Sequence, residues 1–470
     1  MTVLTVVAVV GLRSAPAMAP YGLGAVVLLL VPALVFLVPT ALVVAELGST
    51  WTGGVYVWVR EALGPRWGLT AVWLQWVQGV VWYPVQLAFI AASVAYVLVA
   101  PDLATSGVYT AVVVLALFWG CTLVTMLGGT LFARLGAWGG VLGTLLPAAL
   151  LVALGGVWLA TGERSQVSLS PAELVPPYTG IATVVLVMSN VLAFTGIEVN
   201  AVHVGHLRAR ARGLPRAVLL GAALVVAVVV LPPIAVSLVV ERADLGATSG
   251  ANIAFGTFLG LWDVPWALQV VSALLAVGAL ASVLTWVAGP SRGLEIAGRA
   301  GLLPPSLQRR NARGTPTGVL LLQGAVVSVL AVLFVVVPDP AAVLALLVGT
   351  AAALYLVMYM MVFVAAVTLR RTHAAVVRGF RTPGMPAVAT IGFAACLAAF
   401  FMTFIPPAAT PVDVGAYPWL TAAAVVLVGT PPLLLYRLRR PGWDQRTPLE
   451  RDEDRGALLA APALDGTPPP

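Results

Sequence analysis

The first apolar run of the sequence is interrupted by the stretch Gly11-Leu12-Arg13-Ser14-Ala15-Pro16-Ala17-Met18-Ala19-Pro20. This stretch begins ten residues after the start of the run. Ten helical residues rise about 15 Å, which is half of a hydrocarbon core roughly 30 Å thick. If the run crosses a membrane, an arginine and two prolines lie near the midplane and interrupt a regular helix. Interrupted spans of this kind are the best sequence indication of a transporter binding site.

The composition requires a membrane protein. Of the 470 residues, 60% are hydrophobic and only 9% are charged, and the mean hydropathy is +1.02. A soluble domain carries about 25% charged residues, so soluble enzymes are excluded, as are disordered and fibrous proteins. The apolar runs are continuous, whereas the strands of a porin alternate polar and apolar residues. We therefore expect an all-α integral membrane protein.

The apolar runs predict twelve transmembrane helices, since each span needs roughly 20 apolar residues. Two amphipathic segments, at about 52–63 and 291–300, lie between spans. A polar segment, 441–470, is rich in proline and charge and is predicted to be a disordered cytoplasmic tail. The predicted spans cover about 2–20, 22–47, 69–99, 108–127, 138–160, 180–201, 215–240, 264–288, 316–337, 341–369, 386–405 and 416–438.

A second interruption falls in the sixth predicted span, at Phe194-Thr195-Gly196-Ile197-Glu198-Val199-Asn200. The first and sixth spans hold corresponding positions if the chain contains two five-helix halves. We therefore expect a 5+5 inverted repeat, at about 1–160 and 180–369, followed by two further helices at 386–438. No simple sequence repeat is visible, so this symmetry rests on hydropathy and on the two interruptions.

The charge distribution predicts the orientation. The net charge is +7 and all 25 basic residues are arginines. Arginines crowd the loops after even-numbered spans, whereas the opposite loops hold only Arg164 and Arg242 together with eight of the 18 acidic residues. The positive-inside rule then places both termini in the cytoplasm, in a multi-pass protein of the inner (plasma) membrane. This asymmetry explains the basic pI of about 9.8 without nucleic acid as a partner.

Neither a cofactor nor a metal is expected. The two cysteines, Cys121 and Cys396, lie inside apolar runs and are interpreted as inert core residues. Three histidines do not make a convincing metal site, and no arrangement of polar residues is placed for catalysis. The sequence therefore predicts a protein that is not an enzyme.

Several short strings, in this order and spacing, are similar to those of a known family. The chain resembles bacterial amino acid permeases of the amino acid–polyamine–organocation superfamily, over about residues 3–440. Within the superfamily it is most similar to the glutamate/γ-aminobutyrate antiporter group. The strings are Gly11-Leu12-Arg13, Val44-Ala45-Glu46-Leu47, Gly53-Gly54-Val55-Tyr56, Gly64-Pro65-Arg66-Trp67-Gly68, Trp73-Leu74-Gln75-Trp76, Trp82-Tyr83-Pro84, Phe194-Thr195-Gly196-Ile197-Glu198, Gly289-Pro290-Ser291-Arg292-Gly293 and Leu302-Leu303-Pro304.

The resemblance implies a leucine-transporter-type fold that moves amino acids by alternating access, with substrate between spans 1 and 6 and spans 3, 8 and 10. A glutamate/γ-aminobutyrate antiporter is the favoured function. An amino acid/proton symporter of other specificity is the alternative, and a membrane-embedded sensor or enzyme is a rival from another class. The partners are a small amino acid and the lipid bilayer, and a homo-oligomer is left open.

The first interruption supplies one half of the predicted binding site. Unwinding frees backbone N–H groups at about Ala15 to Met18, and these suit a substrate carboxylate. A buried Arg13 needs an anion or a water-filled cavity. Its partner is either a substrate carboxylate or, as a structural pair, a protein carboxylate or backbone carbonyls. The predicted substrate-binding residues of this segment are Arg13, Ser14, Ala15, Pro16 and Ala17.

The second interruption and three other spans supply the rest. Gly196 permits a non-helical backbone, and the resemblance implies that Phe194 covers the substrate. Glu198 is interpreted as a gating or proton-coupling residue, or alternatively as a carboxylate that braces the break. Aromatic residues in membrane helices also serve as packing or interface anchors. The remaining predicted substrate-binding residues are Phe194, Thr195, Gly196, Ile197, Trp82, Ser282, Trp286, Tyr355 and Tyr359.

Overall fold

A computed structural model describes residues 2–128, 131–176, 180–199, 201–202, 210–241, 248–337, 339–406 and 415–446. Within these ranges the secondary structure is helical, apart from an isolated bridge between Ala300 and Asp444. The helices are α1 (Thr2–Val9), α2 (Ala15–Met18), α3 (Gly24–Pro32), α4 (Val38–Thr50), α5 (Val55–Leu63), α6 (Pro65–Val97), α7 (Gly107–Leu127), α8 (Leu131–Gly140), α9 (Leu146–Ala160), α10 (Ile181–Ser189), α11 (Arg210–Val239), α12 (Gly250–Gly260), α13 (Pro265–Arg299), α14 (Thr317–Val336), α15 (Pro340–Thr372), α16 (Met385–Met402), α17 (Tyr417–Gly429) and α18 (Pro431–Leu438).

Ten helical stretches of the described chain are long and apolar enough to cross a membrane. They match ten of the predicted spans, and the protein is therefore a multi-pass membrane protein. Two stretches combine α-helices with short π-helical segments, η3 (Ala33–Leu37) between α3 and α4 and η5 (Val141–Leu145) between α8 and α9. The total of twelve transmembrane helices and the inverted repeat remain predictions.

The two other predicted spans, 2–20 and 180–201, are broken into short pieces. The first consists of α1, the 3₁₀ turn η1 (Leu12–Ser14), α2 and a second 3₁₀ turn, η2 (Ala19–Tyr21). The second consists of α10 and the 3₁₀ helix η7 (Asn190–Phe194), after which Thr195 and Gly196 leave the helical conformation. Both interruptions lie where glycine and polar residues replace the apolar pattern, and the first also contains prolines.

One local prediction differs from the structure, and one helix was not predicted. The segment 291–300 was expected to be separate from its preceding span, but α13 runs without a break through Pro290 to Arg299. A proline inside a membrane helix is tolerated where neighbouring groups satisfy the freed carbonyl. The sequence did not indicate α12, a short helix that follows α11 and contacts α2 and α13.

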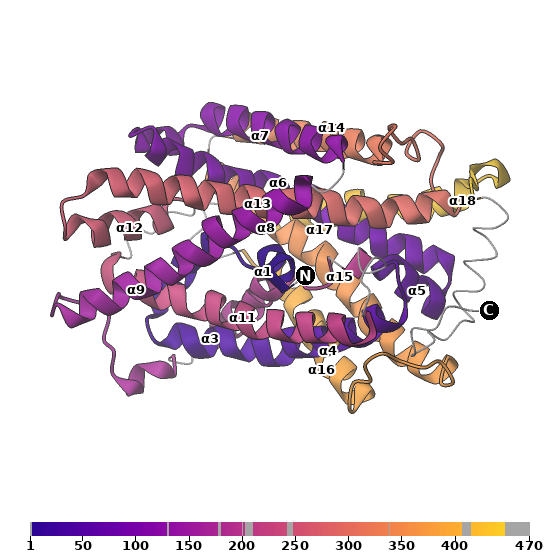
Figure 1. Cartoon of the computed structure of the whole chain (residues 1–470), viewed down its shortest axis with the longest axis horizontal. Coiled ribbons are helices and arrows are strands. Elements are labelled where there is room, and N and C mark those ends of the chain that lie inside the picture. Colours follow the sequence, from indigo (N-terminus) through magenta and orange to yellow (C-terminus); the bar gives the residue numbers. More distant parts are fainter. Residues whose placement is uncertain are drawn as a thin grey trace.

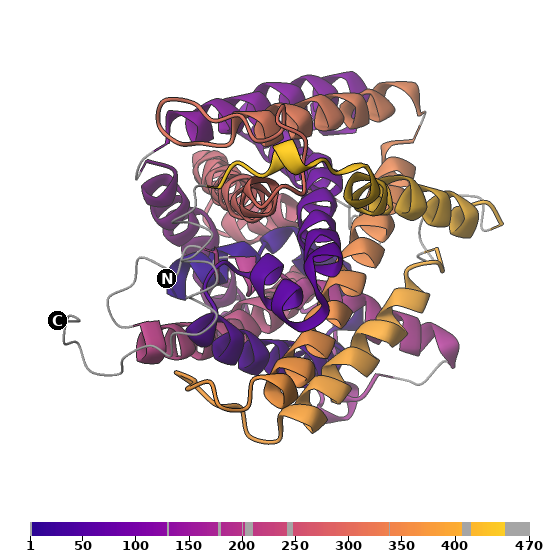
Figure 2. The same ribbon diagram turned by 90° about the vertical axis from the view of Figure 1, so that its right-hand side faces the viewer.

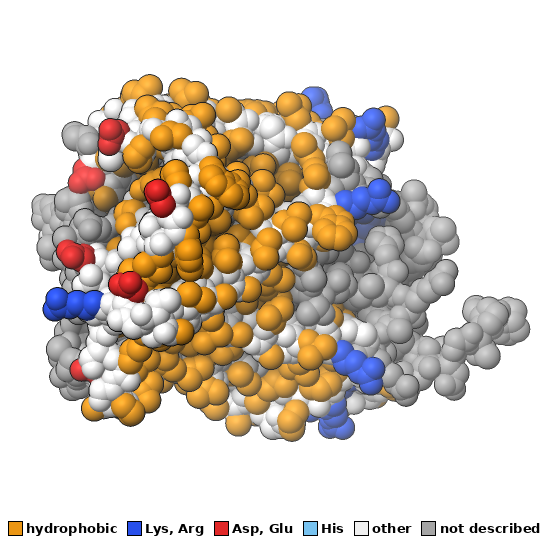
Figure 3. Space-filling view, turned by 60° about the vertical axis from the view of Figure 1, so that its left-hand side comes forward, with side chains coloured by type: hydrophobic (Ala, Val, Ile, Leu, Met, Phe, Trp, Pro, Cys, Tyr) orange, Lys and Arg blue, Asp and Glu red, His pale blue; other side chains and the backbone are white. Residues whose placement is uncertain are grey.

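The helices form a bundle whose long axis is horizontal in Figure 1. Both ribbon views place α7 and α14 side by side along one flank, where they pack against the central pair α6 and α13 (Figures 1 and 2). A hydrophobic surface covers the middle of the bundle in Figure 3, between one end where acidic side chains gather and another where arginines gather. We call these the acidic end and the basic end.

The predicted disordered tail begins with a segment that the structure describes. Residues 441–446 lie against the basic end of α13, where the Gln445 N–H donates to the Arg299 carbonyl at 3.3 Å. The Gln308 side chain also donates to the Trp443 carbonyl at 2.9 Å. The predicted tail beyond this point, 447–470, lies outside the described residues.

Candidate functional site

The two helix interruptions meet at Gly196. This glycine has φ of +110°, a conformation that residues with a Cβ rarely adopt. A Cβ built on Gly196 would lie 2.9 Å from the carbonyl oxygen of Ala8 and 2.9 Å from Cζ2 of Trp286. Ala8 is in the last turn of α1, so the backbone of one interruption packs directly against the other. Only glycine fits this position, both in conformation and in space.

Glu198, two residues further on, is buried and fully engaged by other helices. Its Oε1 accepts hydrogen bonds from Gln75 Nε2 of α6 at 2.9 Å and from the Tyr355 hydroxyl of α15 at 2.5 Å. Its Oε2 accepts a hydrogen bond from the Tyr359 hydroxyl at 2.5 Å. One carboxylate therefore connects the interrupted segment to two continuous helices. Charge-assisted hydrogen bonds of this kind are shorter and stronger than neutral ones.

Tyr359 completes this network, because its hydroxyl accepts a 2.7 Å hydrogen bond from the Gly196 N–H while it donates to Glu198. Breaking the helix at Gly196 leaves backbone groups without their helical partners. The tyrosine supplies one replacement acceptor. The conformation of the break and the position of the carboxylate are therefore set by the same side chain.

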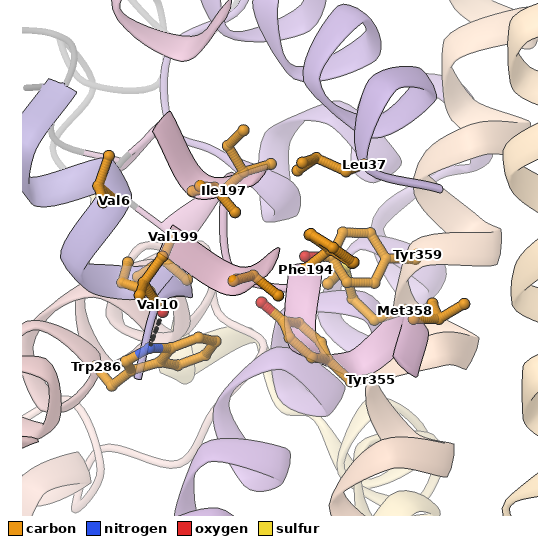
Figure 4. Close-up of a cluster of buried hydrophobic side chains, with 14 of the residues drawn as sticks. Val6, Val10, Leu37, Phe194, Ile197, Val199, Trp286, Tyr355, Met358 and Tyr359 are labelled. Carbon is orange, nitrogen blue, oxygen red and sulfur yellow. Dashed lines mark hydrogen bonds between the residues drawn. The ribbon is translucent and has the colours of Figure 1, made fainter. Parts of the chain in front are cut away.

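An aromatic cluster lies beside this network. Figure 4 shows Trp286, Tyr355 and Tyr359 gathered around Phe194 and the interrupted segment. The ring centroid of Trp286 is 5.6 Å from that of Tyr355 and 5.9 Å from that of Trp82, and Tyr355 lies 4.7 Å from Tyr359. Such spacings are typical of favourable aromatic pairs. Four predicted residues from three helices are thus brought together with the break.

The Gly11–Ala17 segment differs from the prediction in one respect. The Ala15 N–H is not free, because it donates a hydrogen bond to the Leu12 carbonyl at the end of η1. The Ser14 hydroxyl donates to the Gly11 carbonyl at 3.2 Å. In addition, α2 has four residues, and so short a helix has few aligned peptide dipoles at its N-terminus. The Ala15 N–H is therefore occupied in this conformation, and the predicted carboxylate site at this segment stays a prediction.

Arg13 is partly buried in η1 and makes no hydrogen bond or ion pair with a residue that the structure describes. The structure does not bring it into the network of Glu198. A cation at membrane depth without a protein partner is costly. The expectation that Arg13 faces an anion therefore stays a prediction.

The interruption of the first span borders a small cavity of about 10 Å³, which is room for roughly one water molecule. Its lining includes Gly11, Gln86, Phe89, Thr144 and Leu275. A free amino acid is far larger than this cavity. This cavity therefore cannot hold a substrate in the conformation described.

Two further predicted residues have local roles. The Thr195 hydroxyl donates to the Leu192 carbonyl at 2.9 Å and so ends η7. Ser282 is buried one turn before Trp286 on α13.

Sequence reasoning missed Gln75 and Phe36 as members of the site. Gln75 is a polar residue inside an apolar span, which is a signal for an inward-facing position. Phe36 packs edge-on to Tyr359 at 4.9 Å and had no such signal.

A second buried carboxylate joins helices at the basic end. Glu46 of α4 pairs with Arg370 of α15 at 2.5 Å and with Arg378 at 3.0 Å, and it accepts from the Thr382 N–H at 2.7 Å. Burial lowers the pKa of Arg378, and the neighbouring Glu46 opposes this shift. The network holds α4, α15 and the loop before α16 together on one side of the bundle.

The comparisons with known proteins identify the family of this chain. Residues 1–429 match the family model described as amino acid permease. The chain is 35% identical to an uncharacterized transporter of Legionella pneumophila over 88% of this chain and 90% of the relative. It is 29% identical to a glutamate/gamma-aminobutyrate antiporter of Lactococcus lactis, over 90% and 86% respectively. It is 23% identical to a probable agmatine/putrescine antiporter of the same species over 74% of each chain. With two interrupted helices meeting at Gly196 in a bundle of membrane-spanning helices, this chain belongs to the amino acid permease family of transporters.

Proposed function

We propose that this transporter is an amino acid antiporter of the glutamate/γ-aminobutyrate type that works by alternating access. The observation that carries the proposal is the hydrogen-bonded contact of Glu198 with Tyr355 and Tyr359 at 2.5 Å each. It joins an interrupted helix to α15, a continuous one. Such contacts are the elements that a rocking transporter must make and break in each cycle.

The substrate site lies between the two interruptions. The amino group of the substrate binds near the carbonyls freed at Ala193 to Thr195, and its carboxylate binds on the side of Gly11 to Ala17. Trp286 and Phe194 cover the apolar part of the substrate. Arg13 supplies the positive charge for a second carboxylate, which distinguishes glutamate from neutral amino acids.

Glu198 acts as the gate. We take the described conformation as the closed one, in which the carboxylate accepts hydrogen bonds from Gln75, Tyr355 and Tyr359. Protonation removes the negative charge that these donors stabilise, so it weakens the contact between the interrupted segment and α15. Proton uptake at this residue therefore favours opening. The arginine-rich basic end faces the cytoplasm in this proposal, as the positive-inside rule requires.

Counterflow of labelled amino acids into liposomes tests the proposal. Purified protein is reconstituted in vesicles loaded with unlabelled γ-aminobutyrate, and uptake of labelled glutamate is measured against neutral and basic amino acids. Glutamate uptake that requires internal γ-aminobutyrate is expected. Uptake that needs only a proton gradient would instead support a symporter. The absence of flux with every substrate of the panel would contradict the proposal.

A further inference from the structure

A cavity of about 350 Å³ opens at the acidic end, between the ends of α6, α12 and α13. Its volume is within the range of about 300–1,000 Å³ that is typical of small-molecule sites. The cavity reaches Gln269 on α13, whereas Trp286 of the candidate site is seventeen residues further along the same helix. This separation is about 26 Å, so the cavity is distinct from the substrate site.

The mouth of the cavity is surrounded by exposed apolar side chains. Val99 lines it and is 70% exposed, and Trp266, next to the lining residue Pro265, is 63% exposed. Trp262 is also exposed. Tryptophan is enriched where helices of a membrane protein emerge from the hydrocarbon region. The cavity therefore opens where lipid headgroups meet the protein.

The lining is mainly apolar but includes three polar groups, Tyr96, Asp263 and Gln269. The Asp263 carboxylate is exposed and makes no ion pair or hydrogen bond with any side chain in the described ranges. A carboxylate next to an apolar cavity attracts a cation that carries an apolar body. The tyrosine hydroxyl and the glutamine amide are the lining groups able to donate a hydrogen bond to a phosphate.

Backbone geometry singles out the same cavity. Within the described residues, positive φ outside glycine occurs at Val99, with φ of +57°, and at Asp263, with φ of +51°. Both residues line this cavity. Such conformations are costly for residues with a Cβ, particularly for a β-branched valine, and they cluster at ligand sites.

We propose that this cavity binds a phospholipid with a primary ammonium headgroup, a phosphatidylethanolamine, from the leaflet at the acidic end. The ammonium donates hydrogen bonds to the Asp263 carboxylate, and the apolar part of the lipid packs against Leu259, Leu268 and Val99. A choline headgroup has no N–H to donate, so it binds less well. An anionic headgroup without an ammonium is repelled by Asp263 and by the other acidic side chains at this end.

Occupancy of the cavity has a consequence for the transport site. The lipid contacts α6, α12 and α13 together, and α12 also contacts α2 and η1 of the interrupted first span. The Asn252 amide of α12 already donates to the Ser93 hydroxyl of α6 at 3.3 Å, one turn below the cavity. A bound lipid therefore stabilises the arrangement of α12 that covers the first interruption.

Native mass spectrometry of the full-length protein tests the inference. The protein in detergent is titrated separately with phosphatidylethanolamine, phosphatidylcholine and phosphatidylglycerol of identical acyl chains. We expect phosphatidylethanolamine to bind at least tenfold more tightly than the other two. Equal binding of the three lipids would overturn the proposal. Octylamine, a simple amphiphilic ammonium compound, serves as a competitor. If phosphatidylethanolamine does not displace bound octylamine, the two do not share the cavity, and the proposal is also overturned.

Two variants locate the lipid. Asp263→Asn removes the charge, and Gly260→Leu places a side chain in the cavity at a position where a Cβ meets no atom within 4 Å. Both are expected to lose the preference for phosphatidylethanolamine, whereas Glu163→Gln, an exposed carboxylate in another loop, retains it. Unchanged lipid binding in both cavity variants would refute the assignment. Because this readout needs no substrate, it is independent of the proposed antiport.

Discussion

The indole nitrogen of Trp286 on α13 donates a 2.8 Å hydrogen bond to the carbonyl oxygen of Ala8 on α1. In a continuous helix this carbonyl would accept from the N–H of Leu12, but α1 ends at Val9. The tryptophan thus satisfies a carbonyl that the interruption leaves without its helical partner. The first interrupted span is therefore fixed by a side chain from a helix 278 residues away in sequence.

Trp286→Phe keeps an aromatic ring but removes this donor. A hydrogen bond contributes about 0.5–1.5 kcal/mol, so the closed conformation should lose up to about tenfold in population relative to open ones. Hydrogen exchange of the peptide covering Thr2–Val9 should become faster. Trp138→Phe is the control, because Trp138 is exposed and has no hydrogen bond to a described residue. Equal exchange in both variants would show that the indole does not hold α1.

Gly196→Ala is expected to abolish transport without loss of the protein from the membrane. The added Cβ lies 2.9 Å from the Ala8 carbonyl oxygen, and the φ of +110° is strained for alanine. The matched control is Gly213→Ala on α11, where a Cβ meets nothing within 4 Å. Counterflow by both variants is compared at equal reconstituted amounts. Normal counterflow by Gly196→Ala would remove the second interruption from the site.

The breaks themselves were predictable from sequence, because Gly, Pro and charged residues interrupt otherwise apolar runs. Glu198 was predictable for the same reason, since an acidic residue inside a membrane span is costly unless it serves a function. The hydrogen-bond partners of Glu198 were harder to predict from the sequence. Tyr355 and Tyr359 were identified by their spacing of one turn, but Gln75 was missed, because no local pattern connects positions 75 and 198.

Other features depend on packing between distant segments. The eighth span was predicted to end at about residue 288, yet α13 continues through Pro290 to Arg299. The helix α12 is short and weakly patterned, and its contacts with α2 and α13 are long-range. The occupied N–H of Ala15 follows from the 3₁₀ turn at Leu12 to Ser14, whereas the sequence suggested a simple unwound segment.

Tyr359→Phe should impair transport more than Tyr355→Phe. Loss of the Tyr359 hydroxyl takes away the side-chain partner of Glu198 Oε2 and also the acceptor of the Gly196 N–H. Loss of the Tyr355 hydroxyl leaves Gln75 on Oε1. A hydrogen bond to a charged group contributes about 1.5–3 kcal/mol, which corresponds to a change of about 10- to 150-fold. The exchange rate of each variant is measured over a range of pH, and equal impairment of the two variants would argue against Tyr359 as the central contact.

Glu46→Gln should destabilise the protein without changing substrate specificity. It leaves Arg370 and Arg378 without their common anion at a largely buried position, and breaking such a pair costs about 3–5 kcal/mol. Thermal unfolding in detergent is the measurement, with Glu173→Gln as an exposed control. The double variant Glu46→Gln/Arg370→Gln should recover part of the loss. If the single variant unfolds at the temperature of the parent, the network does not hold the basic end together.

Arg13 provides the sharpest test of substrate class. It is partly buried at the first interruption and has no ion-pair partner in the described part of the chain. We propose that its counter-ion is the side-chain carboxylate of glutamate. Arg13→Ala should then raise the KM for glutamate by about 100-fold or more. This is the change expected for loss of a charge-assisted contact of about 3 kcal/mol. The KM for γ-aminobutyrate, which has one carboxylate, should change less. Arg13→Lys retains the charge but not the two-pronged geometry of the guanidinium, so its effect should lie between those of the parent and Arg13→Ala. Counterflow with glutamate, γ-aminobutyrate and glutamine is measured for the parent protein and both variants. A uniform change for every substrate would instead identify Arg13 as a structural cation of the interrupted span, and the preference for an acidic amino acid would then have to come from another residue.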